Sequence, residues 1–286
     1  MSHTSLQART GAIRRPRAAE QGISLIELLV AMAVGLIVIL IATTIYVEGM
    51  RNFSFRTGQS ENLGNSRYAL GTLDNEFTKA GYRRDPTQSM DEAFPADAAA
   101  YPNGCQFAVG QAMYALDPGT LCMRYQARDN DEKDCAGSAA GIAGLGAYQA
   151  PPAPALGAGL FVEKYSLNDK GALVCQAGNQ AEGGQDVAIG VKDVFFEFGV
   201  GKGTDSFAER RVEEFKVTTP TGEDVIRSLR YAVLLVSTGQ KITGGIDSSV
   251  CDRWTKAGGT AESCDTSKGQ LYQLASGSLT LRNLMP

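Results

Sequence analysis

The sequence predicts an α+β fold, with one long N-terminal helix followed by a globular domain that contains an antiparallel sheet. An apolar segment runs from Ile23 to Val47 with Glu27 as its only charge, and this length and composition favour a helix that crosses a membrane. Beyond about residue 85, short β-rich runs alternate with turn residues. We expect the second half of the helix to pack on the sheet, because both elements must bury an apolar face.

The charge distribution argues against a nucleic-acid-binding protein. Residues 1–22 carry four Arg and one Glu, a net charge of +3, which leaves −7 for the rest of a chain whose net charge is −4. An acidic body repels phosphate backbones, so we expect no nucleic-acid partner. The 43% of hydrophobic residues is ordinary for folded proteins, and 286 residues suffice for one large domain or two small ones.

Histidine usage narrows the chemistry further. The single His, His3, precedes the apolar segment, so a chain shortened at Gly22 contains no His. Ser-His-Asp catalysis and His-bound zinc are excluded for that shortened chain, and its Ser, Asp and Glu residues lack a base to activate a nucleophile. We therefore predict no enzyme activity, no metal ion and no cofactor.

The six cysteines indicate disulfides in an oxidising compartment. Their count is even and none forms a Cys-x-x-Cys pair. Sequence alone leaves many pairings open, and the simplest one joins neighbours along the chain. Each bridge would contribute about 2–4 kcal/mol to the free energy of unfolding by constraining the unfolded chain. The expected pairs are Cys105–Cys122, Cys135–Cys175 and Cys251–Cys264.

The apolar segment also predicts an orientation. As a helix, its 25 residues span roughly 37 Å, which is enough to cross a bilayer. Arg residues precede it, so the positive-inside rule places the N-terminus in the cytoplasm and the rest of the chain outside the inner membrane. Two alternatives stay open: a secretory signal with the cleavage pattern Ala31–Ala33, or a plain signal-anchor helix.

The start of this segment resembles a known processing signal. Residues 22–30, Gly-Ile-Ser-Leu-Ile-Glu-Leu-Leu-Val, are similar to the type IV prepilin signal. That family implies a prepilin peptidase that cuts between Gly22 and Ile23 on the cytoplasmic side, removes residues 1–22 as a leader and methylates the new N-terminal amine. Glu27 then becomes the fifth residue of the mature protein. Ile23 replaces the more common Phe at the first mature position, a departure that the family tolerates.

The carboxylate of Glu27 is costly in a membrane. A charge in a spanning helix costs about 2.5–3.5 kcal/mol on insertion scales, and such residues mark functional sites. A new ammonium at Ile23 neutralises this charge, within one helix or between neighbouring helices. Our hypothesis is that Glu27 pairs with the amine of a neighbouring subunit. Because this ion pair forms at only one axial offset between the two helices, it would favour that offset during assembly.

Beyond the apolar segment, apolar residues continue to recur at the intervals of a helix. Gly81 and Pro86 then predict the end of that helix. We predict one helix from Ile23 to Ala80. The expected regions are a leader at 1–22, a long helical region at 23–82 that spans the membrane at 23–47, and a periplasmic β-rich domain at 83–286. The predicted apolar face comprises Leu63, Leu70, Leu73, Phe77 and Ala80, at spacings of seven, three, four and three residues.

The domain beyond the helix contains six β-rich runs that we predict to be strands. After the first of them lies an Ala-, Gly- and Pro-rich stretch, 136–159, which we interpret as a long surface loop. The predicted strands cover residues 119–125, 160–167, 187–200, 213–218, 229–237 and 271–281.

An acidic run, Asp129–Asp134, resembles half of a calcium-binding loop. An EF-hand needs Gly at its sixth position and Glu at its twelfth, where this chain has Asp134 and Ala140. We interpret the run as a solvated acidic turn and leave an irregular calcium site open. The pairs Arg83–Arg84 and Arg210–Arg211 are interpreted as surface charges, and Trp254 as a packing anchor.

Short blocks across the globular region resemble the PilW family of type IV pilus minor pilins. The family implies a low-abundance subunit that joins other minor pilins and the major pilin, uses the inner-membrane assembly platform, primes pilus assembly and lies at the pilus tip. Two alternatives stay open: a minor pseudopilin of type II secretion and a signal-anchored periplasmic binding module. The blocks are residues 80–82, 121–125, 134–137, 173–175, 190–194, 198–199 and 279–283.

Overall fold

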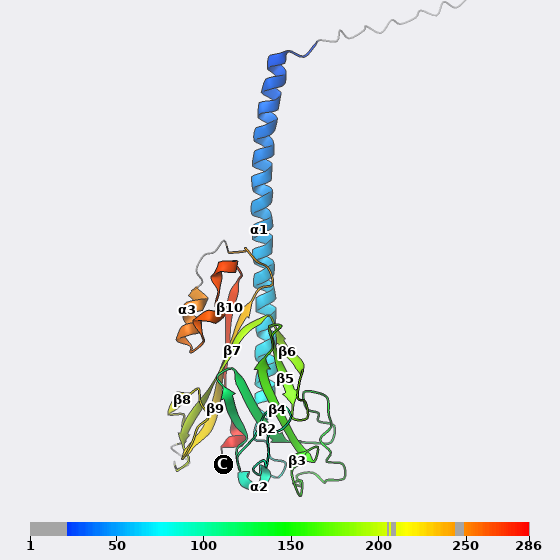
Figure 1. Cartoon of the computed structure of the whole chain (residues 1–286), viewed down its shortest axis with the longest axis vertical. Coiled ribbons are helices and arrows are strands. Elements are labelled where there is room, and N and C mark those ends of the chain that lie inside the picture. The colour runs from blue at the N-terminus through cyan, green and yellow to red at the C-terminus, as the bar shows by residue number, and fades with distance from the viewer. Residues whose placement is uncertain (1–21, 205, 207–209, 244–248, 286) are drawn as a thin grey trace, which may run out of the picture. The chain divides into compact units, whose positions relative to one another are not determined.

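The computed structural model of the chain describes residues 22–204, 206, 210–243 and 249–285 (Figure 1). The chain divides into two units, Met1–Met50 and Arg51–Pro286. Helix α1 (Leu25–Phe77), blue to cyan in Figure 1, contributes residues to both units. The second unit of this division therefore begins inside the helix.

Helix α1 is shorter at both ends than the predicted 23–80. At its start, the side-chain oxygen of Ser24 accepts a 3.3 Å hydrogen bond from the amide of Ile26, as a residue that caps a helix does. At its end, the amide of Ala80 donates to the carbonyl of Phe77, three residues back. Gly81 has a φ of 69°, a left-handed conformation that ends helices. The last predicted turn is therefore a tighter non-α turn.

The face of α1 that the second unit buries differs from the predicted apolar face at its N-terminal side. Leu63 is 43% exposed, because small and polar residues face the sheet there. The amide side chain of Asn62 reaches the carbonyl of Leu271 at 2.9 Å. The buried α1 residues are Gly58, Asn62, Ser66, Ala69, Leu73 and Phe77, whose three- and four-residue spacings follow one side of a helix.

The described strands form two sheets, not the single sheet that the sequence analysis expected, and both are antiparallel apart from the short β3–β4 pair. The first sheet has the order β1-β2-β4-β5-β6 with β3 beside β4, and the second has the order β10-β9-β7-β8. The first contains β1 (Met113–Asp117), β2 (Thr120–Gln126), β3 (Ala155–Leu156), β4 (Gly159–Leu167), β5 (Ala172–Ala177) and β6 (Gln185–Ile189). The second contains β7 (Val191–Lys202), β8 (Glu214–Lys216), β9 (Asp224–Val236) and β10 (Tyr272–Thr280).

Each of the six predicted β-rich runs contains strand, but one of them is divided. Residues 187–200 form the end of β6 and most of β7, because Gly190 turns the chain between them with a φ of 70°. Strands β1, β3 and β5 were not predicted. Short helical segments were not predicted either: α2 (Met90–Ala93), α3 (Ser249–Lys256), η2 (Ala261–Ser263), η3 (Thr266–Lys268) and η4 (Arg282–Leu284).

The core lies where the end of α1 meets both sheets. The ring of Phe77 lies edge-on to Tyr165 of β4, Phe196 of β7 and Tyr231 of β9, with ring centroids 5.1, 5.9 and 5.5 Å apart. Edge-to-face packing of this kind adds to the gain from burial. Phe77 therefore joins the helix and the two sheets in one hydrophobic core.

The sheet that contains β9 is covered on both faces. Side chains alternate along a strand, so Tyr231 and Val233 enter the α1 core. Leu234, on the opposite face, packs with Phe195 and the buried Trp254 of α3. Trp254 is a packing anchor, as its position between two cysteines indicated, and its indole nitrogen donates to the carbonyl of Thr260 at 3.0 Å.

Three disulfides join cysteines that are neighbours in sequence order: Cys105–Cys122, Cys135–Cys175 and Cys251–Cys264. The second of these ties the segment before the Ala-, Gly- and Pro-rich stretch to β5. That stretch is not only a surface loop, because Ala140 and Ile142 are buried in the main core. The prediction for residues 136–159 is therefore wrong for these two residues, and also for Pro151 and Gly159, which are buried too.

Candidate functional site

The predicted cleavage bond lies just before α1. Gly22 and Ile23 are exposed, and Ile23 keeps 76% of its surface accessible. Glu27 lies in the first turn of the helix, four residues after Ile23. The predicted leader falls on residues 1–22, of which only Gly22 is among the described residues. Cleavage after Gly22 would therefore place a new ammonium about one helical turn from the Glu27 carboxylate.

The first unit exposes an apolar helix surface. Every described residue from Gly22 to Met50 is exposed except Gly35, which is half-buried. Leu25 is 78% exposed and Leu40 is 65% exposed. Helix α1 contains an 18-residue window that is apolar enough to cross a membrane, and none of that window is buried in the protein. An apolar surface of this extent marks a membrane or protein interaction site.

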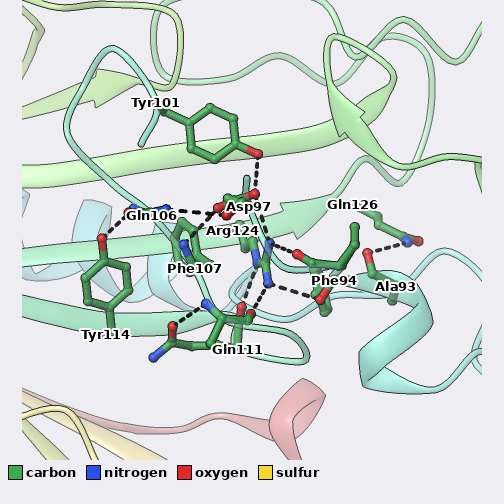
Figure 2. A network of polar contacts seen from close by, with 12 residues as sticks. Ala93, Phe94, Asp97, Tyr101, Gln106, Phe107, Gln111, Tyr114, Arg124 and Gln126 are labelled. Carbon is green, nitrogen blue, oxygen red and sulfur yellow. Dashed lines mark hydrogen bonds and ion pairs between the residues drawn. The ribbon is translucent and has the colours of Figure 1, made fainter. Parts of the chain in front are cut away.

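Arg124 occupies the centre of a polar network in the second unit (Figure 2). It comes from the middle of β2, and its side chain is fully buried. Burial lowers the pKa of its guanidinium to about 10, which still leaves the group charged at neutral pH. The guanidinium donates to four main-chain carbonyls, of Gln111 at 2.6 Å, Pro95 at 2.7 Å, Ala108 at 2.8 Å and Phe94 at 3.1 Å.

The charge of Arg124 also has an acidic partner. The carboxylate of Asp97 lies 3.5 Å from the guanidinium and accepts hydrogen bonds from the hydroxyl of Tyr101 and the amide of Phe107, both at 2.8 Å. Burial, with the Asp97 hydrogen bond, raises the pKa of Tyr101, so this phenol remains a donor. The network holds the segment 94–111 against β2, close to the Cys105–Cys122 disulfide.

Arg84 is a second buried arginine, which corrects its interpretation as a surface charge. Only 6% of its surface is exposed. Its guanidinium donates to the carbonyls of Ala127, Arg128 and Gly146, the last at 2.9 Å. Its backbone amide donates to the side chain of Gln126 at 2.8 Å. These bonds tie the chain after α1 to the start and middle of the 128–158 segment.

Glu163 is a fully buried carboxyl group in β4. It accepts hydrogen bonds from the Tyr165 hydroxyl at 2.8 Å, the Cys135 amide at 3.0 Å and the Tyr125 hydroxyl at 3.1 Å. Burial raises its pKa to about 7, although the hydrogen bond from Tyr165 opposes that rise. Cys135, Glu163 and Cys175 lie close enough to ligate a metal, but their two sulfurs are joined in a disulfide and are not thiolate ligands.

The acidic run beside the loop forms a closed turn. Asp129 accepts hydrogen bonds from the amides of Asp131 at 3.1 Å and Glu132 at 3.0 Å. It also pairs with the exposed Arg128 at 2.8 Å. Asp134 accepts from the amides of Ala136 and Ser138. These carboxylates therefore bind local backbone and side-chain donors.

The sequence analysis did not select Arg124 or Glu163 as functional candidates. Each lies within a predicted β-rich run: Arg124 stands between Met123 and Tyr125, and Glu163 stands between Val162 and Lys164. A charged residue in such a run is the only sequence signal that could have identified them. Their partners come from distant segments, such as Pro95 for Arg124 and Cys135 for Glu163.

Comparison with known proteins agrees with the processing signal. The prokaryotic N-terminal methylation motif matches residues 17–43. No curated protein matches the chain. Among solved structures, a type IV-like pilin from Thermus thermophilus is similar over 80% of this chain and 99% of its own length, with 12% sequence identity and a TM-score of 0.36. The chain therefore combines a prokaryotic N-terminal methylation motif with a long apolar helix that follows it and with antiparallel sheets in the second unit.

Proposed function

We propose that this protein is a minor pilin, which co-assembles with other minor pilins to prime type IV pilus assembly and occupies the pilus tip. One observation carries the proposal: a helix with an exposed apolar first half starts three residues after Gly22 and contains Glu27 as its only charge before Glu48. A folded domain anchored by any apolar helix would not need a carboxylate at this depth, where it costs about 2.5–3.5 kcal/mol.

In the proposed mechanism, a prepilin peptidase cuts between Gly22 and Ile23 on the cytoplasmic side of the inner membrane. The new ammonium and the carboxylate of Glu27 are both poorly solvated in lipid, so each gains from pairing with an opposite charge. An amine of one subunit that meets the Glu27 of its neighbour neutralises both groups at a single axial offset. The apolar surface of α1 then packs against neighbouring helices.

The second unit supports a structural role in the periplasm. Three disulfides fit an oxidising compartment, and four Arg before the apolar segment favour a cytoplasmic N-terminus. Several blocks that resemble the PilW family contain residues that connect separate elements of the second unit. Gly81, in the turn that follows α1, donates its amide to the Arg124 carbonyl in β2, and Cys175 of β5 forms a disulfide.

Intact mass and N-terminal sequencing of the membrane-extracted protein test the processing step. We expect a mature N-terminus at a methylated Ile23. A protein that retains Met1 would favour a signal-anchored module and contradict the proposal.

Charge replacement tests the assembly step. We expect Glu27→Leu and Glu27→Gln to reduce both co-purification with partner pilins and the number of surface pili, while the protein still reaches the membrane. Glu48→Gln, in the same helix beyond the apolar segment, is the matched control and should assemble normally. Normal pilus number in both Glu27 variants would refute the role of the ion pair. Loss of type II secretion with normal pili would favour a pseudopilin.

A further inference from the structure

The second unit buries three arginines, Arg84, Arg124 and Arg227, and the first two differ in how their charge is compensated. Arg124 has Asp97 at 3.5 Å in addition to its carbonyl partners. Arg84 has carbonyl partners, but no ion pair joins it to a carboxylate elsewhere in the described chain. Its Nε is also without a hydrogen-bond partner among the described residues. A buried charge that lacks a counter-charge is costly. An anion bound beside Arg84 would therefore offset the cost of burying its guanidinium.

Arg84 lines an open cavity of about 590 Å³ at the surface of the second unit. Tyr82 and the segment 142–148 form its walls, and Tyr148, in a left-handed conformation with a φ of 59°, remains 73% exposed. The cavity has the size of a site for a small ligand. An aromatic ring with so much exposed surface can cover the face of such a ligand.

The charges of the cavity narrow the chemistry of its ligand. Arg84 favours a carboxylate, because guanidinium groups bind carboxylates with strong charge-assisted hydrogen bonds. The exposed Arg128, which pairs with Asp129 through its Nε at 2.8 Å, offers a second guanidinium. Asp129 also lines the cavity and repels a simple anion. A ligand that offers hydroxyl donors to Asp129 and to the side-chain carbonyl of Asn130 avoids that repulsion.

We propose that this cavity binds a sugar acid, a hexuronate unit whose carboxylate faces Arg84 and Arg128 and whose hydroxyls meet Asp129 and Asn130. The ring of the sugar packs against Tyr148. The residues that line the cavity all belong to the second unit. A sugar-acid site on the second unit would give the protein a recognition function towards acidic polysaccharide.

Ligand-detected NMR on the full chain in detergent micelles tests the site with three probes: D-glucuronate, D-glucose and acetate. We expect D-glucuronate to show saturable binding. D-Glucose lacks the carboxylate and acetate lacks the hydroxyls, so each should bind at least about tenfold more weakly. Failure of D-glucuronate to saturate at millimolar concentrations would overturn the proposal. Equal binding of D-glucose, or equal binding of acetate, would overturn it as well.

Variants locate the binding to this cavity. Arg128→Gln and Tyr148→Ala change exposed side chains, so the fold should be retained, and each should weaken D-glucuronate binding by about tenfold. Arg253→Gln replaces an exposed arginine that lines a different cavity and should bind as the unmodified protein does. Arg84→Lys tests the buried charge, with a thermal unfolding curve to confirm that it folds. Unchanged affinity in both Arg128→Gln and Tyr148→Ala would place any binding elsewhere and refute the site.

Discussion

The carboxyl group of Glu163 accepts a 2.8 Å hydrogen bond from the hydroxyl of Tyr165, and neither residue has any surface exposed to solvent. The Cys135 amide donates to the same carboxyl group, so the contact links β4 to the Cys135–Cys175 disulfide. The charges of Glu76, in α1, and Lys79, just beyond its end, act on Glu163 in opposite directions and form a 2.6 Å ion pair with each other. Glu163 is therefore an acid in a largely apolar setting, where its charged form is disfavoured.

The stability of the second unit should depend on the protonation of Glu163. Burial raises its pKa from an ordinary value of 4.5 to about 7, so the folded state holds the proton more tightly than the unfolded chain does. Its stabilising contribution is complete below about pH 4.5 and is lost as the pH rises to about 7. Glu163→Gln should remove this part of the pH dependence, and denaturant unfolding between pH 4.5 and 8 measures it. Glu182→Gln, an exposed acid, should leave the pH dependence unchanged. Identical pH profiles for Glu163→Gln and the unmodified protein would contradict this assignment.

Arg124 should be among the residues whose loss costs most stability. Arg124→Ala leaves the carboxylate of Asp97 buried without its counter-charge and removes the donor to four carbonyls. Removing one partner of a buried ion pair typically costs about 3–5 kcal/mol. The free energy of unfolding can be followed by the fluorescence of Trp254, the only Trp in the chain. Arg253→Ala, on the exposed side of α3, is the control and should change it by less than about 0.5 kcal/mol. A loss below about 1 kcal/mol for Arg124→Ala would show that the network is not a main stabilising element.

Phe77 should be the most sensitive position in the buried part of α1. Phe77→Ala removes three edge-to-face ring contacts and opens a cavity between the helix and both sheets, so we expect a loss of about 3–5 kcal/mol. Tyr68→Ala removes an aromatic ring from the same helix where it is 64% exposed. Equal losses for the two variants, measured by denaturant unfolding, would contradict the placement of the core.

The Cys251–Cys264 disulfide should hold α3 against the outer face of the second sheet. It closes a loop with a sequence separation of 13 residues, and a bridge of that size contributes about 3 kcal/mol by constraining the unfolded chain. Replacing both cysteines with Ser should lower the free energy of unfolding by about that amount and increase solvent quenching of Trp254. The paired replacement of Cys105 and Cys122 is the comparison. It should destabilise the protein while leaving Trp254 protected in the folded state. Unchanged Trp254 quenching without Cys251–Cys264 would show that packing alone holds α3.

Features that depend on residues close together in the chain could be predicted from the sequence. Hydropathy identified the apolar half of α1, because one uninterrupted segment carries the whole signal. The methylation motif was recognisable for the same reason, since Gly22, Ile23 and Glu27 lie within one and a half helical turns. Strand positions followed from short β-rich runs, although the break at Gly190 needed its left-handed backbone conformation.

The arrangement of charge inside the second unit could be known only from the folded chain. Arg83 and Arg84 are adjacent and chemically identical, yet only Arg84 is buried, because carbonyls from Ala127, Arg128 and Gly146 converge on it. Arg124 and Glu163 likewise depend on partners that lie far along the chain, such as Gln111, 13 residues from Arg124, and Tyr125, 38 residues from Glu163. A local pattern specifies which segments are helix or strand and which segment enters a membrane. The burial of a charge depends on whether distant backbone and side-chain groups can replace its hydration, and that becomes determined when the segments pack together.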